Sequence, residues 1–555
     1  MCLVLQSSRL CNHRYSPIST GKSDGHITTI DTLSDNVLLK IFDSFLSGDD
    51  GDRYRLYPVW TWRELLQVCR RWRQIVLESP RTLDLRIFCT NGTPVREILN
   101  CWPPFPIVIR YHHYHSTDDE DGVFAALEHP SRIRIIDLRL TGPQFDKVAA
   151  VMQGPFPALT YLILRCKGED EDDSGDEDED GNDDEDGDED EVEGQDDNED
   201  ENQDDNVDED GDEDDDKDQE DNEAEDRDDV YERASAVPGG FLGGSAPSLE
   251  YISFSSIPFP ALPALLSSTS DLSFLELRFV PSDGYISPEA LVGCLGGLPK
   301  LEYFSISVLP PDLPPDRIFP PHVTRTLLPA LATIALCGDS EYIEDTISRV
   351  DSPRLKRFSM KYLEPFDFQI PQFFNFISRS GNPEISSSRH ADVTFSSSSD
   401  DVIFAMYPHP DSGLHPVTGY IPCQGGIGRQ LSCMAQVFSQ HSAFLSRVAH
   451  LNLSQLEANE DRHDDEWLHL LRQFSAVRTL HVSLESAGAA ALALEEITGE
   501  MIAEVLPVLD LIYLDGQPVS SVEKFLTARR LSGRPVAIVD TEAEFLERVK
   551  SYVSE

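Results

Sequence analysis

Residues 249–277, LEYISFSSIPFPALPALLSSTSDLSFLEL, contain the pattern that decides the fold of this chain. The pattern is apolar-x-x-apolar-x-apolar, and its two copies here begin 23 residues apart, at Leu249 and Leu272. The alternation in its second half is typical of a strand with one buried face. A repeat length of about 20 to 29 residues is typical of stacked units, because one unit cannot bury its apolar strand face alone.

The same pattern recurs along most of the chain. Its ten copies are Ile133/Ile136/Leu138, Leu159/Leu162/Leu164, Leu249/Ile252/Phe254, Leu272/Leu275/Leu277, Leu301/Phe304/Ile306, Leu331/Ile334/Leu336, Leu355/Phe358/Met360, Val448/Leu451/Leu453, Val477/Leu480/Val482 and Leu509/Ile512/Leu514. Successive copies begin 26, 90, 23, 29, 30, 24, 93, 29 and 32 residues apart. This spacing predicts an α/β fold in which parallel strands stack and are connected by helices, such as Asp464–Phe474 and Glu495–Leu506. A generic α/β domain with coincidental matches is the alternative.

Two long intervals interrupt the pattern. In the first, Glu169–Asp229 contains 42 acidic residues and only two basic ones. Such dense like charge with few apolar residues cannot offset chain entropy, so we expect a disordered acidic insertion over residues 168–230. The second interval includes the strand candidate Asp392–Phe395 and serine-rich stretches, which predict one degenerate repeat and a flexible loop. Residues 1–26 are also expected to be disordered.

The composition excludes several classes of protein. The net charge is −55, but the acidic insertion accounts for −40 of it, so the remainder is a mildly acidic globular sequence. Ten cysteines without a C-x-x-C pair favour a reduced protein of the cytoplasm or nucleus. The first residues lack the basic and long apolar regions typical of a signal peptide, so none is expected, and no apolar run approaches the length needed to cross a membrane. His112–His115 lacks a second ligand cluster, and no catalytic constellation stands out, so neither a metal, a cofactor nor an enzyme is expected.

A separate helical module precedes the repeated pattern. In Ile30–Leu46, apolar residues recur at helical spacing after two suitable N-caps, Ser34 and Asp35. A second helix is predicted from about Thr61, and Pro80 ends it because proline cannot continue a helix. Its apolar residues are Leu65, Leu66, Val68, Cys69 and Trp72.

This module resembles an F-box. The likeness is carried by Leu33, Val68-Cys69-Arg70-Arg71-Trp72, Pro80 and Leu83. Two features depart from the family pattern: Ser34 replaces the usual proline, and residues 47–60 form a longer linker. The resemblance implies an F-box over residues 27–80. The period of the repeated pattern is close to that of leucine-rich repeats, so an irregular leucine-rich-repeat solenoid with parallel strands is expected over residues 81–555. The whole chain resembles F-box proteins that are abundant in mushroom-forming fungi.

The F-box resemblance implies a function without catalysis. The chain would be a substrate receptor of a cullin-RING (SCF-type) ubiquitin ligase that binds a Skp-type adaptor, a cullin scaffold through that adaptor, and an unknown protein substrate. Neither nucleic acid nor a membrane is an expected partner. The expected adaptor-binding residues are Leu33, Val37, Leu38, Ile41, Leu65, Val68, Cys69 and Trp72. The acidic run leaves a second hypothesis open, a histone or basic-protein chaperone.

One column of the repeated pattern is rich in basic residues. The residue after the last apolar position of the first seven copies is, in order, Arg139, Arg165, Ser255, Arg278, Ser307, Cys337 and Lys361. Equivalent positions of parallel strands stack into a ladder, so the basic members Arg139, Arg165, Arg278 and Lys361 are candidate substrate-binding residues for an acidic or phosphorylated segment. Ordinary surface charge is the alternative, and so is binding of the chain's own acidic insertion.

Overall fold

The computed structural model describes residues 30–47, 61–80, 82–112, 117–166, 234–309, 325–363, 371–396, 401–409, 416–455, 463–539, 541, 544–546 and 548–549. The expected disordered N-terminus and acidic insertion lie outside these residues, as do most of the linker at 47–60 and residues 397–399 of the serine-rich stretch. The chain divides into two compact units. The first is Met1–Ile87 with Trp102–Pro106, and the second is Phe88–Cys101 with Ile107–Glu555.

The described residues of the first unit form a helical structure. A 3-10 turn (Ile30–Thr32) precedes the helices α1 (Asp35–Ser47), α2 (Thr61–Val68) and α3 (Arg70–Glu78). The core is apolar and comprises Leu38, Phe42, Leu46, Trp62, Leu65, Leu66, Ile75, Val76, Leu83 and Leu85. The ring of Trp72 packs on that of Phe42 with 4.6 Å between centroids. The prediction of one continuous helix from Thr61 was wrong, because Cys69 has an extended backbone (φ −157°, ψ 171°) between α2 and α3.

The second unit contains one large, mostly parallel sheet. From β2 onward its strand order is β2-β3-β4-β5-β6-β7-β9-β11-β14-β13-β12-β15-β16-β17-β18. The bounds of these strands are β2 (Ile107–Tyr111), β3 (Ile133–Leu140), β4 (Tyr161–Cys166), β5 (Tyr251–Ser255), β6 (Phe274–Val280), β7 (Tyr303–Val308), β9 (Thr333–Gly338), β11 (Arg357–Tyr362), β12 (His390–Phe395), β13 (Asp401–Tyr407), β14 (Val417–Pro422), β15 (His450–Gln455), β16 (Thr479–Val482), β17 (Leu511–Leu514) and β18 (Ala537–Val539). The short strands β8 (Thr326–Leu327) and β10 (Val350–Asp351) pair separately, and β1 (Ile87–Cys89) spans the boundary between the units.

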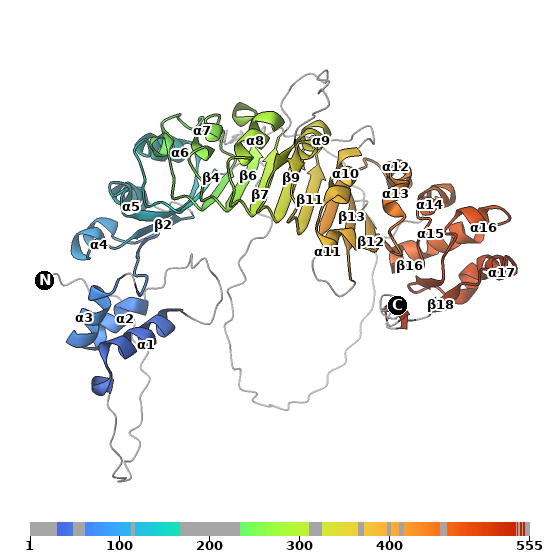
Figure 1. Ribbon diagram of the computed structural model, residues 1–555, viewed down its shortest axis with the longest axis horizontal. Coiled ribbons are helices and arrows are strands. Elements are labelled where there is room, and N and C mark those ends of the chain that lie inside the picture. The colour runs from blue at the N-terminus through green and yellow to red at the C-terminus, as the bar shows by residue number, and fades with distance from the viewer. Residues whose placement is uncertain are drawn as a thin grey trace, which may run out of the picture. The chain divides into compact units, whose positions relative to one another are not determined.

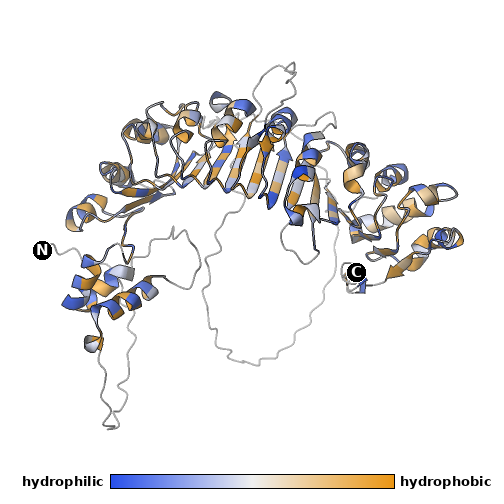
Figure 2. Ribbon diagram, in the orientation of Figure 1, coloured by the Kyte–Doolittle hydropathy of each residue, from blue (hydrophilic) through white to orange (hydrophobic). Residues whose placement is uncertain are grey.

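Each of the ten copies of the sequence pattern forms a strand of this sheet. The last two apolar positions of each copy lie within the strand and are buried. Along β7 and β9, buried residues alternate strictly with half-buried ones, and the alternation of hydrophobic and hydrophilic residues is visible along the central strands in Figure 2. The prediction of an α/β fold with parallel strands is therefore confirmed at the level of a mixed α/β fold with a mostly parallel sheet.

Helices connect the strands. Their bounds are α4 (Val95–Cys101), α5 (Thr117–Leu127), α6 (Gly142–Val151), α7 (Leu262–Leu266), α8 (Pro288–Leu295), α9 (Ser340–Ser348), α10 (Pro371–Arg379), α11 (Pro383–Ser386), α12 (Ile427–Ser439), α13 (Ser442–Leu445), α14 (Asp464–Leu471), α15 (Leu484–Glu495), α16 (Met501–Glu504) and α17 (Glu523–Leu531). Figure 1 shows that α5 to α9 lie along one side of the sheet. The other side of those strands has no such layer among the described residues, so it presents the half-buried positions of the pattern.

Two local predictions needed correction. The second long interval holds three strands, since β12 and β13 pair antiparallel, as do β13 and β14, and this three-strand insertion joins β11 to β15 through parallel pairs at either end. A single degenerate repeat was therefore wrong there, although the strand candidate Asp392–Phe395 lies in β12. Of the helix expected over Glu495–Leu506, the structure has the short α16 (Met501–Glu504). The long helix of that region, α15, ends where the prediction began.

Cys423 and Cys433 are joined by a disulfide that links β14's C-terminal end to α12. This differs from the expectation of a fully reduced protein, which rested on the absence of a C-x-x-C pair. The two cysteines are ten residues apart, and the turn between β14 and α12 brings them together. Within the described residues, we find no helix with the length and apolar character needed to cross a membrane.

Candidate functional site

Helix α1 presents apolar side chains on two adjoining faces. Leu38, Phe42 and Leu46 are buried in the core of the first unit. Val37, Ile41 and Phe45 follow the same four-residue spacing but remain 42%, 43% and 52% exposed. At 100° per residue the six positions cover an arc of about 180°, well beyond the stripe of roughly 100° that a helix buries against one core. Half of this arc is therefore open.

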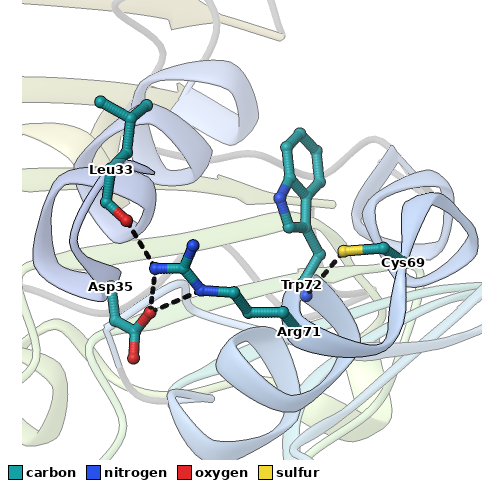
Figure 3. A network of polar contacts seen from close by, with 5 residues as sticks. All are labelled: Leu33, Asp35, Cys69, Arg71 and Trp72. Atoms are coloured by element: carbon teal, nitrogen blue, oxygen red, sulfur yellow. Dashed lines mark hydrogen bonds and ion pairs between the residues drawn. The ribbon is translucent and has the colours of Figure 1, made fainter. Parts of the chain in front are cut away.

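An arginine of α3 fixes the start of α1. Arg71 donates from Nε and Nη2 to Oδ1 of Asp35 at 3.0 and 2.6 Å, and from Nη2 to the carbonyl oxygen of Leu33 at 2.5 Å (Figure 3). The Asp35 carboxylate lies in the first turn of α1, where negative charge is favourable. An exposed ion pair of this kind contributes at most about 1 kcal/mol, so its main effect is to fix the orientation of α1 relative to α3.

Cys69 forms the joint between α2 and α3. It is the N-cap of α3, and its Sγ accepts a hydrogen bond from the backbone N of Trp72 at 3.5 Å (Figure 3). Across the same joint, Arg73 donates from Nε and Nη2 to the carbonyl oxygen of Leu66 at 3.0 and 2.8 Å, which satisfies an acceptor at the end of α2. The Val68–Trp72 stretch thus ends one helix and starts the next.

The structure divides the expected adaptor-binding residues into three groups. Val37, Ile41 and Val68 are exposed, with Val68 at 58%, and Leu33, Cys69 and Trp72 are half-buried. Leu38 and Leu65 must be corrected, because both are buried in the unit's own core, where they stabilise the helices and present no surface. Sequence reasoning omitted Phe45 from the site, although it shares the four-residue spacing of Val37 and Ile41. We call Val37, Ile41, Phe45 and Val68 the exposed apolar set.

Part of the basic column in the second unit forms a ladder of register partners on neighbouring strands. Backbone register pairs Arg139 with Arg165, Arg165 with Ser255, and Ser255 with Arg278. A register shift in β6, between Leu277 and Val280, interrupts the ladder after Arg278. Beyond the shift, register pairs Ser307 with Cys337 and Cys337 with Lys361. The four basic candidates therefore lie in two separate segments.

Carboxylates neutralise the far members of this ladder. Arg278 forms an ion pair with buried Glu276 at 2.9 Å, and Glu276 also accepts a hydrogen bond from Ser253 at 2.8 Å. Lys361 lies 3.6 Å from the carboxylate of Asp401. Of the other two candidates, Arg139 and Arg165, the latter also has a carboxylate contact, with Asp137 at 3.8 Å.

Sequence reasoning did not foresee the residues that surround these two arginines. Arg110 of β2 approaches the buried carboxylate of Asp137 at 3.4 Å, and Arg165 approaches it at 3.8 Å. Arg110 also donates from Nε to Nε2 of His112 at 2.7 Å. Burial lowers the pKa of His112, nearby arginines lower it further, and Asp137 opposes both effects. Since the imidazole is thereby held neutral, three arginines face one carboxylate at β2–β4.

Neither the protein-family models nor the curated proteins contain a match to this chain. Its function must therefore be argued from its own residues. Within the part of the chain that the structure describes, no group of three or more His, Cys, Asp or Glu side chains is placed to hold a metal ion. His113–His115 of the histidine-rich stretch lie outside that part.

A second feature of the sheet could have been found from the sequence. The third position of the repeated pattern is aromatic in four successive copies, at Tyr161, Tyr251, Phe274 and Tyr303. These residues are register partners on neighbouring strands β4 to β7. All four are half-buried and lie on the same side of the sheet as the arginines, because positions two or four apart in a strand share a face.

Proposed function

We propose that this chain is a substrate-receptor subunit of a cullin-RING (SCF-type) ubiquitin ligase. In this proposal residues 27–80 are an F-box that binds a Skp-type adaptor, and the adaptor links the chain to the cullin. The repeated strand–helix part is a leucine-rich-repeat domain that holds a protein substrate. The chain itself then does no chemistry. It raises the local concentration of the substrate near the conjugating enzyme.

The observation that carries this proposal is the exposed apolar set. A small helical unit that exposes Val37, Ile41 and Phe45 in one row on α1 has an incomplete hydrophobic surface. Soluble proteins rarely expose contiguous apolar patches unless another molecule covers them. A helix with a row of anchors at four-residue spacing is a recurrent form of docking element, since it can lie in an apolar groove of a partner.

The exposed apolar set can supply a substantial part of the binding energy of the expected contact. Burying one large aliphatic or aromatic side chain contributes roughly 1.5 to 3 kcal/mol. The exposed apolar set has four such side chains, all partly exposed in the chain alone. Because each is already about half covered, burying the remainder of all four contributes on the order of 3 to 6 kcal/mol, which offsets part of the cost of about 4 to 15 kcal/mol for bringing two proteins together. These four residues are therefore expected to be the main energetic anchors, with polar contacts setting orientation.

Co-purification tests the proposed function. The full chain carries an affinity tag, is expressed in a eukaryotic host with a Skp-type adaptor and cullin, and is purified at moderate ionic strength. We expect the adaptor in equimolar amount, with cullin bound through it. Co-purification of histones in place of the adaptor would instead support the basic-protein chaperone. In that case high salt, or deletion of residues 169–229, should abolish histone binding, because a polyanion attracts cationic partners in a salt-dependent manner.

A further inference from the structure

The open face of the sheet carries a continuous stack of aromatic rings. Phe274 lies between Tyr251 and Tyr303, with ring centroids 4.0 and 4.1 Å away and interplanar angles of 6° and 3°. Tyr161 extends the stack at 5.5 Å from Tyr251. Since the ring faces contact one another, the rings present their edges to a ligand on this side of the sheet. The result is a row of ring edges across β4 to β7.

Ring edges and phenols suit a particular kind of ligand. The edge of an aromatic ring carries partial positive charge, and it packs well against the side or face of another apolar group. Burial raises the pKa values of Tyr251 and Tyr303 above the ordinary value for a phenol. Both phenols therefore stay protonated at neutral pH, and that of Tyr303 is hydrogen-bonded to Ser305. Apolar side chains are favoured at such a row.

The arginine cluster of β2–β4 lies on the same face as this row, four residues further along β4. Its members are Arg110, Arg139 and Arg165, grouped around the single carboxylate of Asp137. The carboxylate of Asp137 lies 3.4 Å from Arg110 and 3.8 Å from Arg165, so one negative charge is set among three positive ones. Arginine forks bind carboxylate or phosphate oxygens with two hydrogen bonds each. This end of the face is thus built for an anion.

The distance between the two features sets the length of the ligand. Tyr161 and Arg165 are on the same strand, β4, with four residue steps between them. At about 3.3 Å per step along the strand and about 4.8 Å per strand across the sheet, Arg165 lies roughly 14 to 16 Å from the rings of Tyr251 and Phe274 on β5 and β6. An extended peptide covers this distance in about four residues.

We propose that this face binds an extended segment of a partner protein in which an acidic or phosphorylated residue lies about four residues from a large apolar one. The anion contacts Arg139 and Arg165, and the apolar side chain packs on the ring edges of Tyr251 and Phe274. This inference deepens the proposed function by giving the chemistry of the substrate, and it rests on that function only in calling the partner a substrate. The binding itself requires no adaptor.

Selection from a random peptide library tests this inference. The library is selected on the purified full chain without any adaptor, and in parallel on a variant lacking residues 169–229, in which the chain's own acidic residues cannot compete. We expect enrichment of acidic residues at a fixed spacing from an aromatic or aliphatic one. The enriched peptides are then measured by fluorescence anisotropy. A phosphoserine version and a glutamate version of each peptide show which anion is preferred.

Matched variants test whether the enriched peptides bind to this face of the sheet. The double variant Arg139→Glu/Arg165→Glu should weaken binding at least ten-fold, and Phe274→Ala should weaken it with little effect on the salt dependence. Arg429→Glu is the control, because this exposed arginine lies on α12, away from the face. Thermal unfolding of each variant shows whether it is folded. If no acidic peptide is enriched on either chain, or if the folded double variant binds as well as the wild type, the inference is wrong. Either result leaves adaptor capture unaffected.

Discussion

Replacing Ile41 with aspartate will lower the affinity of the chain for a Skp-type adaptor by at least about 100-fold, which corresponds to roughly 2.8 kcal/mol. The substitution removes one apolar anchor, worth roughly 1.5 to 3 kcal/mol, and places a carboxylate in the contact, which adds a desolvation penalty. Because Ile41 is 43% exposed, the helical unit itself should remain folded. Titration calorimetry with purified chain and adaptor measures the effect.

Two matched variants make this result specific. Leu492 on α15 has the same exposed fraction as Ile41, 43%, so Leu492→Asp introduces an equivalent charge in the second unit and should leave adaptor affinity unchanged. Leu38→Asp instead places a carboxylate in the core of the first unit and should unfold its helices. If the Ile41→Asp variant binds the adaptor with an affinity within three-fold of the wild type, α1 is not part of the contact.

The second large effect is a loss of stability expected in the second unit, where a helix packs on the sheet. Trp467 of α14 is among the largest fully buried side chains, and its ring lies 6.0 Å from that of Phe395 in β12. Trp467→Ala removes this packing and leaves a cavity, which costs about 3 to 5 kcal/mol. The unfolding transition of the second unit should shift to clearly lower temperature in scanning calorimetry. Leu484→Ala, at an exposed position of the neighbouring helix α15, is the control and should cost less than about 1 kcal/mol. Equal shifts for both variants would contradict the assignment of Trp467 to the core.

Strands were predictable wherever the repeated pattern was complete. The pattern indicates a strand with one buried face, preceded by one apolar residue. At that preceding position Leu249 and Leu331 are fully buried. β13 and β14 were not predicted, because the antiparallel strands of the three-strand insertion need no such leading residue. Their sequences, DVIFAMY and VTGYIP, also lack the spacing of the parallel strands.

The two faces of α1 could not be assigned from the sequence. Leu38 and Ile41 both fit helical spacing, and the apolar arc is wide enough to contain a packed face and an open one. Only packing against α2 and α3 decides which is buried. The break at Cys69 was equally hidden, because the apolar spacing continues through it. The contacts that support the break, from Arg73 to Leu66 and from Trp72 to Cys69, depend on the folded arrangement.

Part of the arginine cluster could be predicted from the sequence. The basic column identified Arg139 and Arg165 correctly as neighbours, since equivalent positions of parallel strands are register partners. It did not reveal Glu276 or Asp401, which neutralise Arg278 and Lys361, because these acids occupy other positions of the pattern or another strand. Net charge at a sheet surface depends on all columns together, so a single column overstates the extent of a basic stripe.

Hydrogen exchange of the full chain with and without a purified Skp-type adaptor tests the central proposal most directly. We expect the adaptor to slow exchange of backbone amides in α1 (Asp35–Ser47) and in α2 (Thr61–Val68), which together carry the exposed apolar set. Amides of the sheet strands β3 to β7 should exchange at unchanged rates. Unchanged exchange throughout α1 and α2 at saturating adaptor, or protection confined to the second unit, would contradict the proposal.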